Sequence, residues 1–279
     1  MMWEVKAPSG PRARDLRYTN YSREYDPLGQ YRSPTDASGF VDGINKAGLC
    51  GFHDWHLSHT AKIQTVVDYG VAAAGALRAD DRYFPTMNAD WYWNDSPNPT
   101  SPSTAFALDF GSGAVSNAAE RGTLRHVQVV RNGDAVVGPN GRYELSADGT
   151  EVRDTTVTAK LTWRRCVEGM AWDGRTCAGT PTAFTQEQAL VRAAQEAAAS
   201  GEPWRVPSAK ELNWLVQRKL ASPAIDHAFF PATPPVPTWT STPEIRLPSS
   251  AWAVDFDIGQ IGIAGRDTLH VLRLARDPR

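Results

Sequence analysis

The sequence predicts an α+β protein made of two diverged tandem copies of one module, each with two helices followed by a mainly antiparallel, β-rich half. Three observations lead to this prediction. Ordered motifs recur at one fixed offset, capping signals open short helical patterns, and the apolar spacing then changes to the period of a strand. We place module one at residues 1–133 and module two at residues 134–279.

The repeat is visible in three short motifs of the first half that return in the second. The matched pairs are Tyr83–Pro85 with Phe229–Pro231, Trp93–Pro97 with Trp239–Pro243, and Ala105–Phe110 with Ala251–Phe256. All three pairs share one offset, so the span from Tyr83 to Gly113 aligns without a gap. Self-similarity at a fixed offset indicates duplicated architecture rather than chance likeness.

Two capping boxes predict helices in module two. Thr185 stands three residues before Gln188, and the alanine-rich run that follows ends at Ser200-Gly201. Ser208 and Glu211 repeat the spacing and open a second helix. The apolar face of this helix, at i, i+3, i+4 spacing, consists of Leu212, Leu215 and Val216. Its counterpart in module one consists of Ile63, Val66 and Val67.

Alternating apolar residues after the helices predict strands. They are Phe106, Leu108 and Phe110 in module one, and Trp252, Val254 and Phe256 in module two. Because Asp109 and Asp255 fall on the opposite side, we expect one face to be buried. Glycine turns follow, and the segments ending at Arg131 and Arg276 supply a last strand to an antiparallel sheet.

Turn-forming residues predict the boundary between the modules at residues 132–141, where Asn132-Gly133-Asp134 and Gly138–Gly141 lie. Beyond it, Tyr143–Val157 predicts a strand pair that opens module two. Nothing before Trp3 can play this part in module one. We therefore expect module one to lack its opening hairpin and the natural chain to start upstream.

Composition and charge exclude several classes of protein. Hydrophobic residues make up 41% of the chain and charged residues 22%, as in a folded globular protein. The net charge of -2 removes the electrostatic attraction of a general nucleic-acid binder, so we predict no nucleic-acid partner. The longest apolar stretch, Val71–Leu77, is far too short to span a bilayer, and we predict no membrane insertion. No secretory signal, cofactor or oligomeric state can be inferred.

Two of the three cysteines predict a disulfide bond. Cys166 and Cys177 bracket a turn-rich loop that can bring their sulfur atoms together. Three cysteines are too few for a disulfide scaffold.

An ordered run of motifs resembles a known family. The run in module two contains Trp163, Cys166 and Cys177, Trp204–Leu212, Phe230-Pro231, Trp239–Thr242, Ala251–Gly259 and Leu272–Leu274. It is similar to the collagen-like adhesin C-terminal domain family, also called the Lcl C-terminal domain, and the resemblance covers nearly the whole chain twice.

The resemblance implies a fold similar to C-type lectins, to formylglycine-generating enzymes and to the variable proteins of diversity-generating retroelements. It implies a bacterial, surface-exposed or secreted setting and binding to glycans or cell-surface proteins. In module one, Gly48–Gly51 resembles the family's glycine-leucine-cysteine motif, whose cysteine partner would fall near Thr35. The resemblance therefore implies that Cys50 is a free, buried thiol.

Two motifs suggest metals but carry simpler alternatives. His53, His56 and His59 would lie on one face of a helix as zinc ligands, yet they align with a strand-to-helix turn in module two, so solvated or hydrogen-bonded histidines are preferred. Trp93-Asn94-Asp95 matches the triplet of calcium-dependent lectins, but its counterpart Trp239–Ser241 offers no carboxylate. We predict no metal site, and turn-capping or solvent-facing roles for Asp109 and Asp255.

No catalytic set can be assembled from the spacing of nucleophiles, bases and carboxylates, so we predict a protein that is not an enzyme. Two alternatives stay open: a formylglycine-generating type of enzyme, which would use Cys166 and Cys177 as a reactive pair, and a structural or pilus-associated spacer. The preferred hypothesis is a non-catalytic, adhesin-like recognition protein that is extracellular or on the cell surface.

The expected ligand-binding residues lie in the late loops, where the two copies diverge while the framework persists. Aromatic, amide and charged groups on loops held by a sheet are typical of a binding surface. They are Asn88, Asp90, Trp91, Tyr92, Asn98, Asn117, Glu120 and Arg121 in module one, and Thr238, Glu244, Arg246, Gln260, Arg266, Asp267 and His270 in module two.

Overall fold

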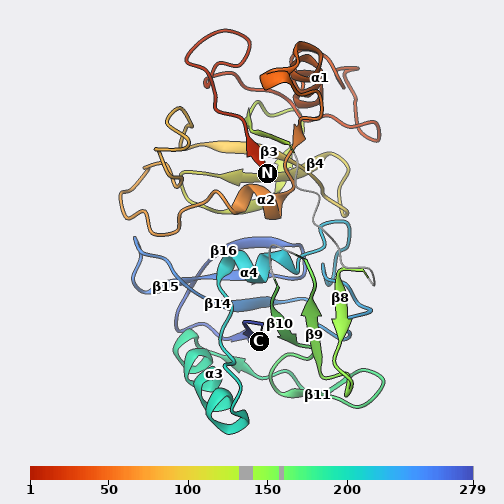
Figure 1. The fold of residues 1–279 in the computed structure, drawn as a ribbon, viewed down its shortest axis with the longest axis vertical. Helices are drawn as coiled ribbons and strands as arrows, with labels where there is room; N and C mark the ends of the chain where they lie inside the picture. The colour runs from red at the N-terminus through yellow and green to blue at the C-terminus, as the bar shows by residue number, and fades with distance from the viewer. Residues whose placement is uncertain (132–140, 157–159, 279) are drawn as a thin grey trace. The chain divides into compact units, whose positions relative to one another are not determined.

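A computed structural model describes residues 1–131, 141–156 and 160–278 of the chain (Figure 1). The chain forms two compact units, Met1–Gly133 and Asp134–Arg279, and each is mixed α+β. Most of the predicted boundary segment 132–141 lies outside the described residues. In the part of the chain that is described, no helix combines the length and apolar character that a membrane crossing needs.

Unit 1 contains two α-helices, a short 3₁₀ helix and seven strands among its described residues. The helices are α1 (Ala37–Ala47), η1 (Leu49–Gly51) and α2 (Thr60–Gln64). The strands are β1 (Met2–Trp3), β2 (His56–Leu57), β3 (Trp91–Pro97), β4 (Thr104–Asp109), β5 (Val115–Glu120), β6 (His126–Val127) and β7 (Val129–Arg131).

The strands of unit 1 pair in two groups. β5, β4 and β3 form consecutive antiparallel pairs, and β6 then pairs with β3 in parallel, with Tyr92 opposite His126. The chain next bends into β7, which lies between β1 and β2 and is antiparallel to both. The closing segment, β6 and β7, therefore contributes one strand to each of two sheets. The sequence predicts an antiparallel last strand, whereas β6 is parallel to its neighbour β3.

Unit 2 repeats this plan with additional strands. Its helices are α3 (Gln186–Ser200) and α4 (Ala209–Trp214). Its strands are β8 (Tyr143–Leu145), β9 (Glu151–Asp154), β10 (Thr162–Arg164), β11 (Met170–Trp172), β12 (Cys177–Gly179), β13 (Ala183–Phe184), β14 (Pro237–Pro243), β15 (Ser250–Asp255), β16 (Gln260–Gly265), β17 (His270–Val271) and β18 (Ala275–Arg276).

The strands that the two units share pair in the same way in unit 2 as in unit 1. β14, β15 and β16 form antiparallel neighbours, while β17 is parallel to β14 and antiparallel to β13. β18 pairs with β10, which continues through β9 to β8. The predicted opening hairpin is confirmed as β8 and β9, although its last residue, Val157, lies outside the described residues.

The two predicted capping boxes are confirmed, and they explain where α3 and α4 begin. The Thr185 hydroxyl accepts the Gln188 N–H while the Gln188 side chain accepts the Thr185 N–H, and α3 ends at Gly201 in the left-handed conformation. Ser208 and Glu211 form the same reciprocal pair at α4. α1 begins at the N-cap Asp36, whose carboxylate accepts the Ser38 N–H.

The central strands are buried on both faces, which corrects the prediction that only one face is buried. In β15 the large residues Trp252 and Val254 are at most 1% exposed, but Ala251 and Ala253 are buried too. These alanines pack in one cluster with Ala189 of α3, and α4 also contacts β15 (Figure 1). From the sequence alone, an alanine in a strand could be exposed or could pack against a helix. In β15 the small alanine side chains allow a helix to approach the strand closely.

The same arrangement occurs in unit 1. Ala105 and Ala107 of β4 share a cluster with Phe40 and Ile44 of α1, while Phe106 on the alternate face is fully buried. In each unit, a helix therefore packs against the alanine-bearing face of the central strand. The loops at the strand ends are left to carry variable side chains.

Candidate functional site

The predicted binding residues of unit 1 lie at two opposite ends of its strands. Asn88, Asp90 and Trp91 stand where β3 begins, beside the end of β4. Asn98 and Arg121 lie beyond the other end, where β3 leaves the sheet and β5 ends. The structure therefore divides this set into two groups.

The second group makes hydrogen bonds inside unit 1. The buried Asn98 donates to the Thr104 hydroxyl at 2.7 Å and to the Asn117 carbonyl at 3.1 Å. Arg121 is also buried and donates to the carbonyls of Pro102 and Asn20, both at 2.7 Å. Burial lowers the pKa of Arg121. Of the four residues here, Glu120 is the one with an exposed side chain.

The first group joins residues from the N-terminal segment in a polar surface cluster. We call Asp15, Arg17, Asn88, Asp90, Trp91 and His126 the Asp90 cluster. The Arg17 Nη2 donates to Asp90 Oδ2 at 2.7 Å, and the Trp91 N–H donates to the other carboxylate oxygen, also at 2.7 Å. The side chains of Arg17 and Asp90 remain 50% and 35% exposed. A cation, a carboxylate and an indole thus stand together in contact with solvent.

His126 forms the buried floor of the cluster, with a side chain only 2% exposed. Its Nδ1 lies 3.1 Å from the Leu16 carbonyl, which can only accept, so Nδ1 carries the proton. Nε2 is then free to accept from Arg17 Nε at 3.4 Å and from the Asn88 amide at 3.5 Å. Burial lowers the pKa of His126, which fits a neutral imidazole held in this tautomer.

Aromatic residues flank the cluster. The Arg125 guanidinium lies 5.1 Å from the ring centroid of Trp91 and 5.3 Å from that of Trp93. Tyr92 is buried and its hydroxyl accepts the Asn88 N–H at 2.9 Å. Burial raises the pKa of Tyr92 to about 12, so this hydroxyl stays protonated. Tyr92 thus fixes the backbone of Asn88, whereas Trp91 is partly exposed.

Unit 2 also divides its predicted residues between two strand ends. Thr238, Gln260 and His270 lie near the start of β14, where Thr238 pairs with Val271. Near the other end, Arg246 Nε donates to the buried carboxylate of Glu244 at 3.2 Å. Arg266 donates to the Ser250 carbonyl at 3.2 Å and to Gln186 at 3.3 Å, while Asp267 is exposed.

At three aligned positions among the described residues of unit 2, apolar residues replace the polar members of the Asp90 cluster. The positions that correspond to Asn88, Asp90 and His126 hold Pro234, Val236 and Val271. Trp91 and Tyr92 correspond to Pro237 and Thr238, whereas Trp93 keeps an aromatic counterpart in Trp239. His270 lies 4.6 Å from the Trp239 ring, where Arg125 lies over Trp93 in unit 1. Any ligand of the cluster is therefore specific to unit 1.

The three histidines of the His-x-x-His-x-x-His series have separate partners. The ring Nδ1 of His53 contacts the Asn45 carbonyl, that of His56 the Leu57 carbonyl, and that of His59 the Asp95 carboxylate. Among the described residues, no three His, Cys, Asp or Glu side chains are grouped so that they could hold a metal ion. His59 is the N-cap of α2, in the place where α4 has Ser208.

The lectin-like triplet Trp93–Asp95 is engaged inside the unit. Asn94 is buried, and its Oδ1 accepts from the Thr60 hydroxyl at 2.9 Å and from the Ser96 N–H at 3.0 Å. The Asp95 carboxylate faces His59. These contacts attach β3 to the start of α2. Asp109 caps its turn by accepting the Gly111 N–H at 2.9 Å, and Asp255 accepts the Asp257 N–H at 2.9 Å.

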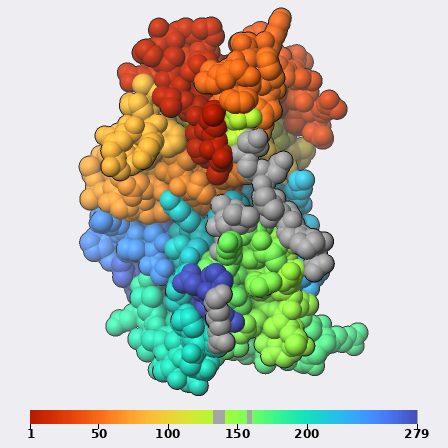
Figure 2. Space-filling view, viewed as in Figure 1, coloured from red at the N-terminus to blue at the C-terminus, as the bar shows by residue number. Residues whose placement is uncertain are grey.

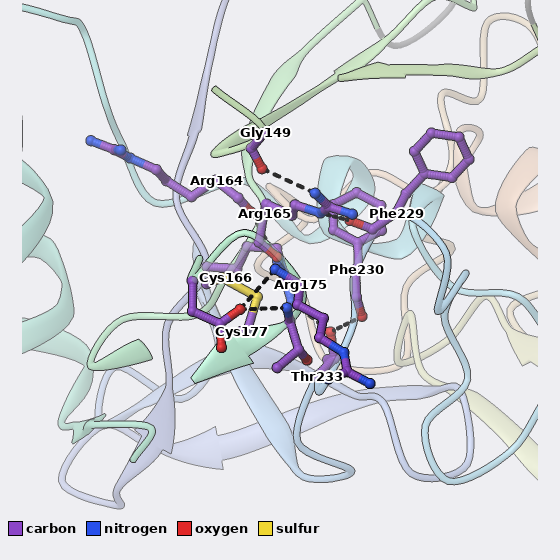
Figure 3. The surroundings of a disulfide bond; sticks show 12 residues. Gly149, Arg164, Arg165, Cys166, Arg175, Cys177, Phe229, Phe230 and Thr233 are labelled. Carbon is purple, nitrogen blue, oxygen red and sulfur yellow. Dashed lines mark hydrogen bonds between the residues drawn. A yellow bond between two sulfur atoms is a disulfide. The ribbon is translucent and has the colours of Figure 1, made fainter. Parts of the chain in front are cut away.

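The predicted disulfide between Cys166 and Cys177 is confirmed, and Figure 3 shows its surroundings. Cys177 is buried and begins β12, opposite Trp172 of β11. Beside the bond, Arg165 donates to the carbonyls of Gly149 at 3.2 Å and Phe229 at 3.1 Å. The bond thus closes a hairpin that Arg165 attaches to the rest of unit 2.

Cys50 is a free thiol but it is exposed, which corrects the expectation that it is buried. It lies in η1 with a positive φ of 53°. The chain reverses here after Gly48 ends α1 in the left-handed conformation, and this reversal turns the Cys50 side chain towards solvent.

Sequence reasoning missed Asp15, Arg17, Arg125 and His126. Asp15 and Arg17 belong to the segment before α1, for which the repeat provides no aligned partner. The difference between His126 and Val271 was a usable signal, because it falls directly before a motif that both copies share.

The paired units, each with the same strand plan and helical cover, define a tandem-repeat protein of the α+β class. The chain belongs to the Lcl C-terminal domain family, whose model matches residues 1–131 and 151–276. Comparison with curated proteins found no match, and comparison with solved structures also found none.

Proposed function

We propose that this chain is a non-catalytic, adhesin-like recognition protein, extracellular or on the bacterial cell surface, with a C-type-lectin-like fold in each unit. Family membership supports this setting, and a disulfide suits an oxidising compartment. Recognition takes place at the late loops rather than at a catalytic centre.

The observation that carries the proposal is the Asp90 cluster. Its exposed Arg17 guanidinium and partly exposed Asp90 carboxylate lie beside the partly exposed Trp91 indole. A carboxylate accepts and a guanidinium donates hydrogen bonds to hydroxyl groups, while an indole offers an apolar face to a sugar ring. Between the two ligand classes, a glycan or a cell-surface protein, this combination favours a glycan.

A glycan and glycosaminoglycan array probed with the purified chain tests the proposal. We expect Asp90→Asn to weaken binding to the best array ligand by about tenfold or more, because the amide no longer offers two acceptor oxygens. Asp81→Asn is the matched control, since Asp81 is an exposed carboxylate of the same unit outside the cluster. Trp91→Ala should also weaken binding.

Three outcomes would count against this function. The array could show no ligand, Asp90→Asn could bind as the wild type does, or Asp81→Asn could lose as much affinity. If a cell-surface protein binds while every glycan fails, the ligand class is wrong but the role in recognition stands. Circular dichroism and thermal melting of each variant separate loss of binding from loss of fold.

A further inference from the structure

A groove runs along α1 in unit 1, on the side that faces the N-terminal segment. It has a volume of about 860 Å³. In the space-filling view the N-terminal segment, in red, and the α1 region, in orange, lie side by side on the surface of this unit (Figure 2). The lining residues are Ala7, Ser9, Pro11, Arg12, Leu16, Arg17, Tyr18, Pro34, Thr35, Gly39, Phe40, Gly43, Ile44, Ala47 and Leu49. This volume falls in the range of small-molecule sites.

The helix α1 forms one wall, and a row of small residues beside Phe40 and Ile44 leaves space along it. Gly39, Gly43 and Ala47 follow each other at i, i+4 spacing on the groove side of α1. Gly39 is required by the fold, since a Cβ atom would lie 1.8 Å from the Ser33 carbonyl oxygen. At Gly43 a Cβ atom would meet nothing within 4 Å, so the space beside it is open.

The opposite wall is held in place by backbone hydrogen bonds. The Ala7 N–H donates to the Arg12 carbonyl at 3.0 Å, and the Arg14 N–H donates back to Ala7 at 2.9 Å. Further along, the Tyr18 N–H donates to the Arg125 carbonyl at 2.8 Å. The groove is therefore preformed, and a ligand would not need to order this wall.

The charged groups at the groove carry a net positive charge. Three cations, Lys6, Arg12 and Arg17, share the two carboxylates of Glu4 and Asp90. Among the described residues that line it there are two arginines, Arg12 and Arg17, and no Asp or Glu. Arg12 shares the carboxylate of Glu4 with Lys6, whose Nζ lies 4.3 Å from the centroid of the Phe40 ring, so one anion faces two cations. Apolar walls with a positive edge complement a ligand that has an apolar body and an acidic group.

We propose that the α1 groove binds a small hydrophobic anion, such as an acyl or aryl carboxylate, with its apolar body against Phe40, Ile44 and Gly43 and its acid at Arg12 and Arg17. The site is distinct from the late-loop surface, although Arg17 belongs to both. It does not depend on a glycan binding at the Asp90 cluster.

Calorimetric titration with dodecanoate, dodecanol and dodecylamine tests the chemistry of the ligand. We expect dodecanoate, below its micelle concentration, to bind most tightly and the amine most weakly. Arg12→Gln should reduce the preference for acid over alcohol by about tenfold, because a neutral amide replaces the cation. Failure of dodecanoate to bind, equal binding of the amine, or an unchanged preference in Arg12→Gln would overturn the proposal.

The location is tested by filling the groove. Gly43→Phe places a side chain in the open space and should abolish dodecanoate binding, whereas Lys46→Phe adds the same ring to an exposed position of α1 outside the groove and should not. Unchanged binding in Gly43→Phe, or an equal loss in Lys46→Phe, would show that the ligand binds elsewhere. Glycan binding should persist in Gly43→Phe, which separates this site from the Asp90 cluster.

Discussion

Gln128 and Arg273 occupy equivalent positions in the two units, and each attaches the closing segment to the end of the strand with which that segment pairs, β1 or β10. The Gln128 amide donates to the Glu4 carbonyl, and Arg273 Nη1 donates to the corresponding carbonyl of Arg164 at 2.8 Å. Arg273 does more: it also donates to the Arg165 carbonyl at 2.5 Å and to the Thr233 hydroxyl at 2.7 Å. Both side chains are buried, and burial lowers the pKa of Arg273.

Replacing Arg273 should therefore destabilise unit 2, by an amount that depends on whether the new side chain keeps a hydrogen-bond donor. Arg273→Met removes every donor and leaves the carbonyls of Arg164 and Arg165 without it, so we expect a loss of about 2–4 kcal/mol. Arg273→Gln retains a donor of the kind that unit 1 uses and should lose roughly half as much. Urea unfolding of the three proteins measures the difference, and equal losses in the two variants would contradict the shared role.

Removing the disulfide should lower stability without removing recognition. The double change Cys166→Ala and Cys177→Ala opens a loop with a sequence separation of 11 residues, so we expect a loss of about 2–3 kcal/mol. Cys50→Ala is the control, because this thiol is exposed and unbonded. Denaturant unfolding measures stability, and the glycan array measures binding. Loss of a catalytic turnover in the double variant would instead favour the formylglycine-generating type of enzyme.

The repeat and its local signals were predictable from the sequence. The capping boxes at Thr185 and Ser208 are short-range patterns with a known geometry, and both formed as predicted. The spacing of Cys166 and Cys177 across a turn-rich loop was similarly sufficient. Such features depend on residues close in the chain, so one sequence carries the information.

Features that depend on distant contacts were not predictable. Ala105 and Ala107 are buried because α1 covers them, and their small size alone does not reveal a partner. Arg17 reaches Asp90 only because the N-terminal segment lies beside the start of β3, a relationship across 73 residues. Asn98 and Arg121 are residue types common in binding sites, yet Asn98 bonds to the Asn117 carbonyl and Arg121 bonds to the carbonyls of Pro102 and Asn20 inside unit 1.

Glu211 is expected to stabilise the start of α4 through two separable contacts. Its carboxylate accepts the Ser208 N–H at 2.7 Å and forms paired hydrogen bonds with Arg205 at 2.8 and 2.9 Å. Burial acts to raise the pKa of Glu211, but the hydrogen bonds from Arg205 and Ser208 outweigh it and hold the pKa below its ordinary value.

Glu211→Gln retains an oxygen for the capping box and loses the charge, so we expect a loss of about 0.5–1 kcal/mol. Glu211→Ala loses both contacts and should cost about 1–2 kcal/mol. Thermal melting at neutral pH compares the variants with Glu187→Gln, an exposed change in the first turn of α3. Equal melting temperatures for Glu211→Gln and Glu211→Ala would show that the capping-box contact adds no stability.

His126 should make the fold of unit 1 less stable in mild acid. Burial lowers its pKa in the folded state, with Arg17 and Lys6 acting in the same direction and the Leu16 carbonyl and Asp90 opposing them. In the unfolded chain the imidazole titrates near its ordinary pKa of about 6.5. Below that pH the unfolded state binds the proton more readily than the folded state does, so stability falls with pH until the folded-state pKa is passed.

The variant that tests this effect is His126→Val, which places in unit 1 the residue that unit 2 has at Val271. We expect the free energy of unfolding of the wild type to fall between about pH 6.5 and pH 5 more steeply than that of His126→Val. His270, whose pKa burial also lowers, remains in both proteins and contributes equally to each curve. Parallel curves over this range would mean that His126 takes up its proton as readily in the folded unit as in the unfolded chain.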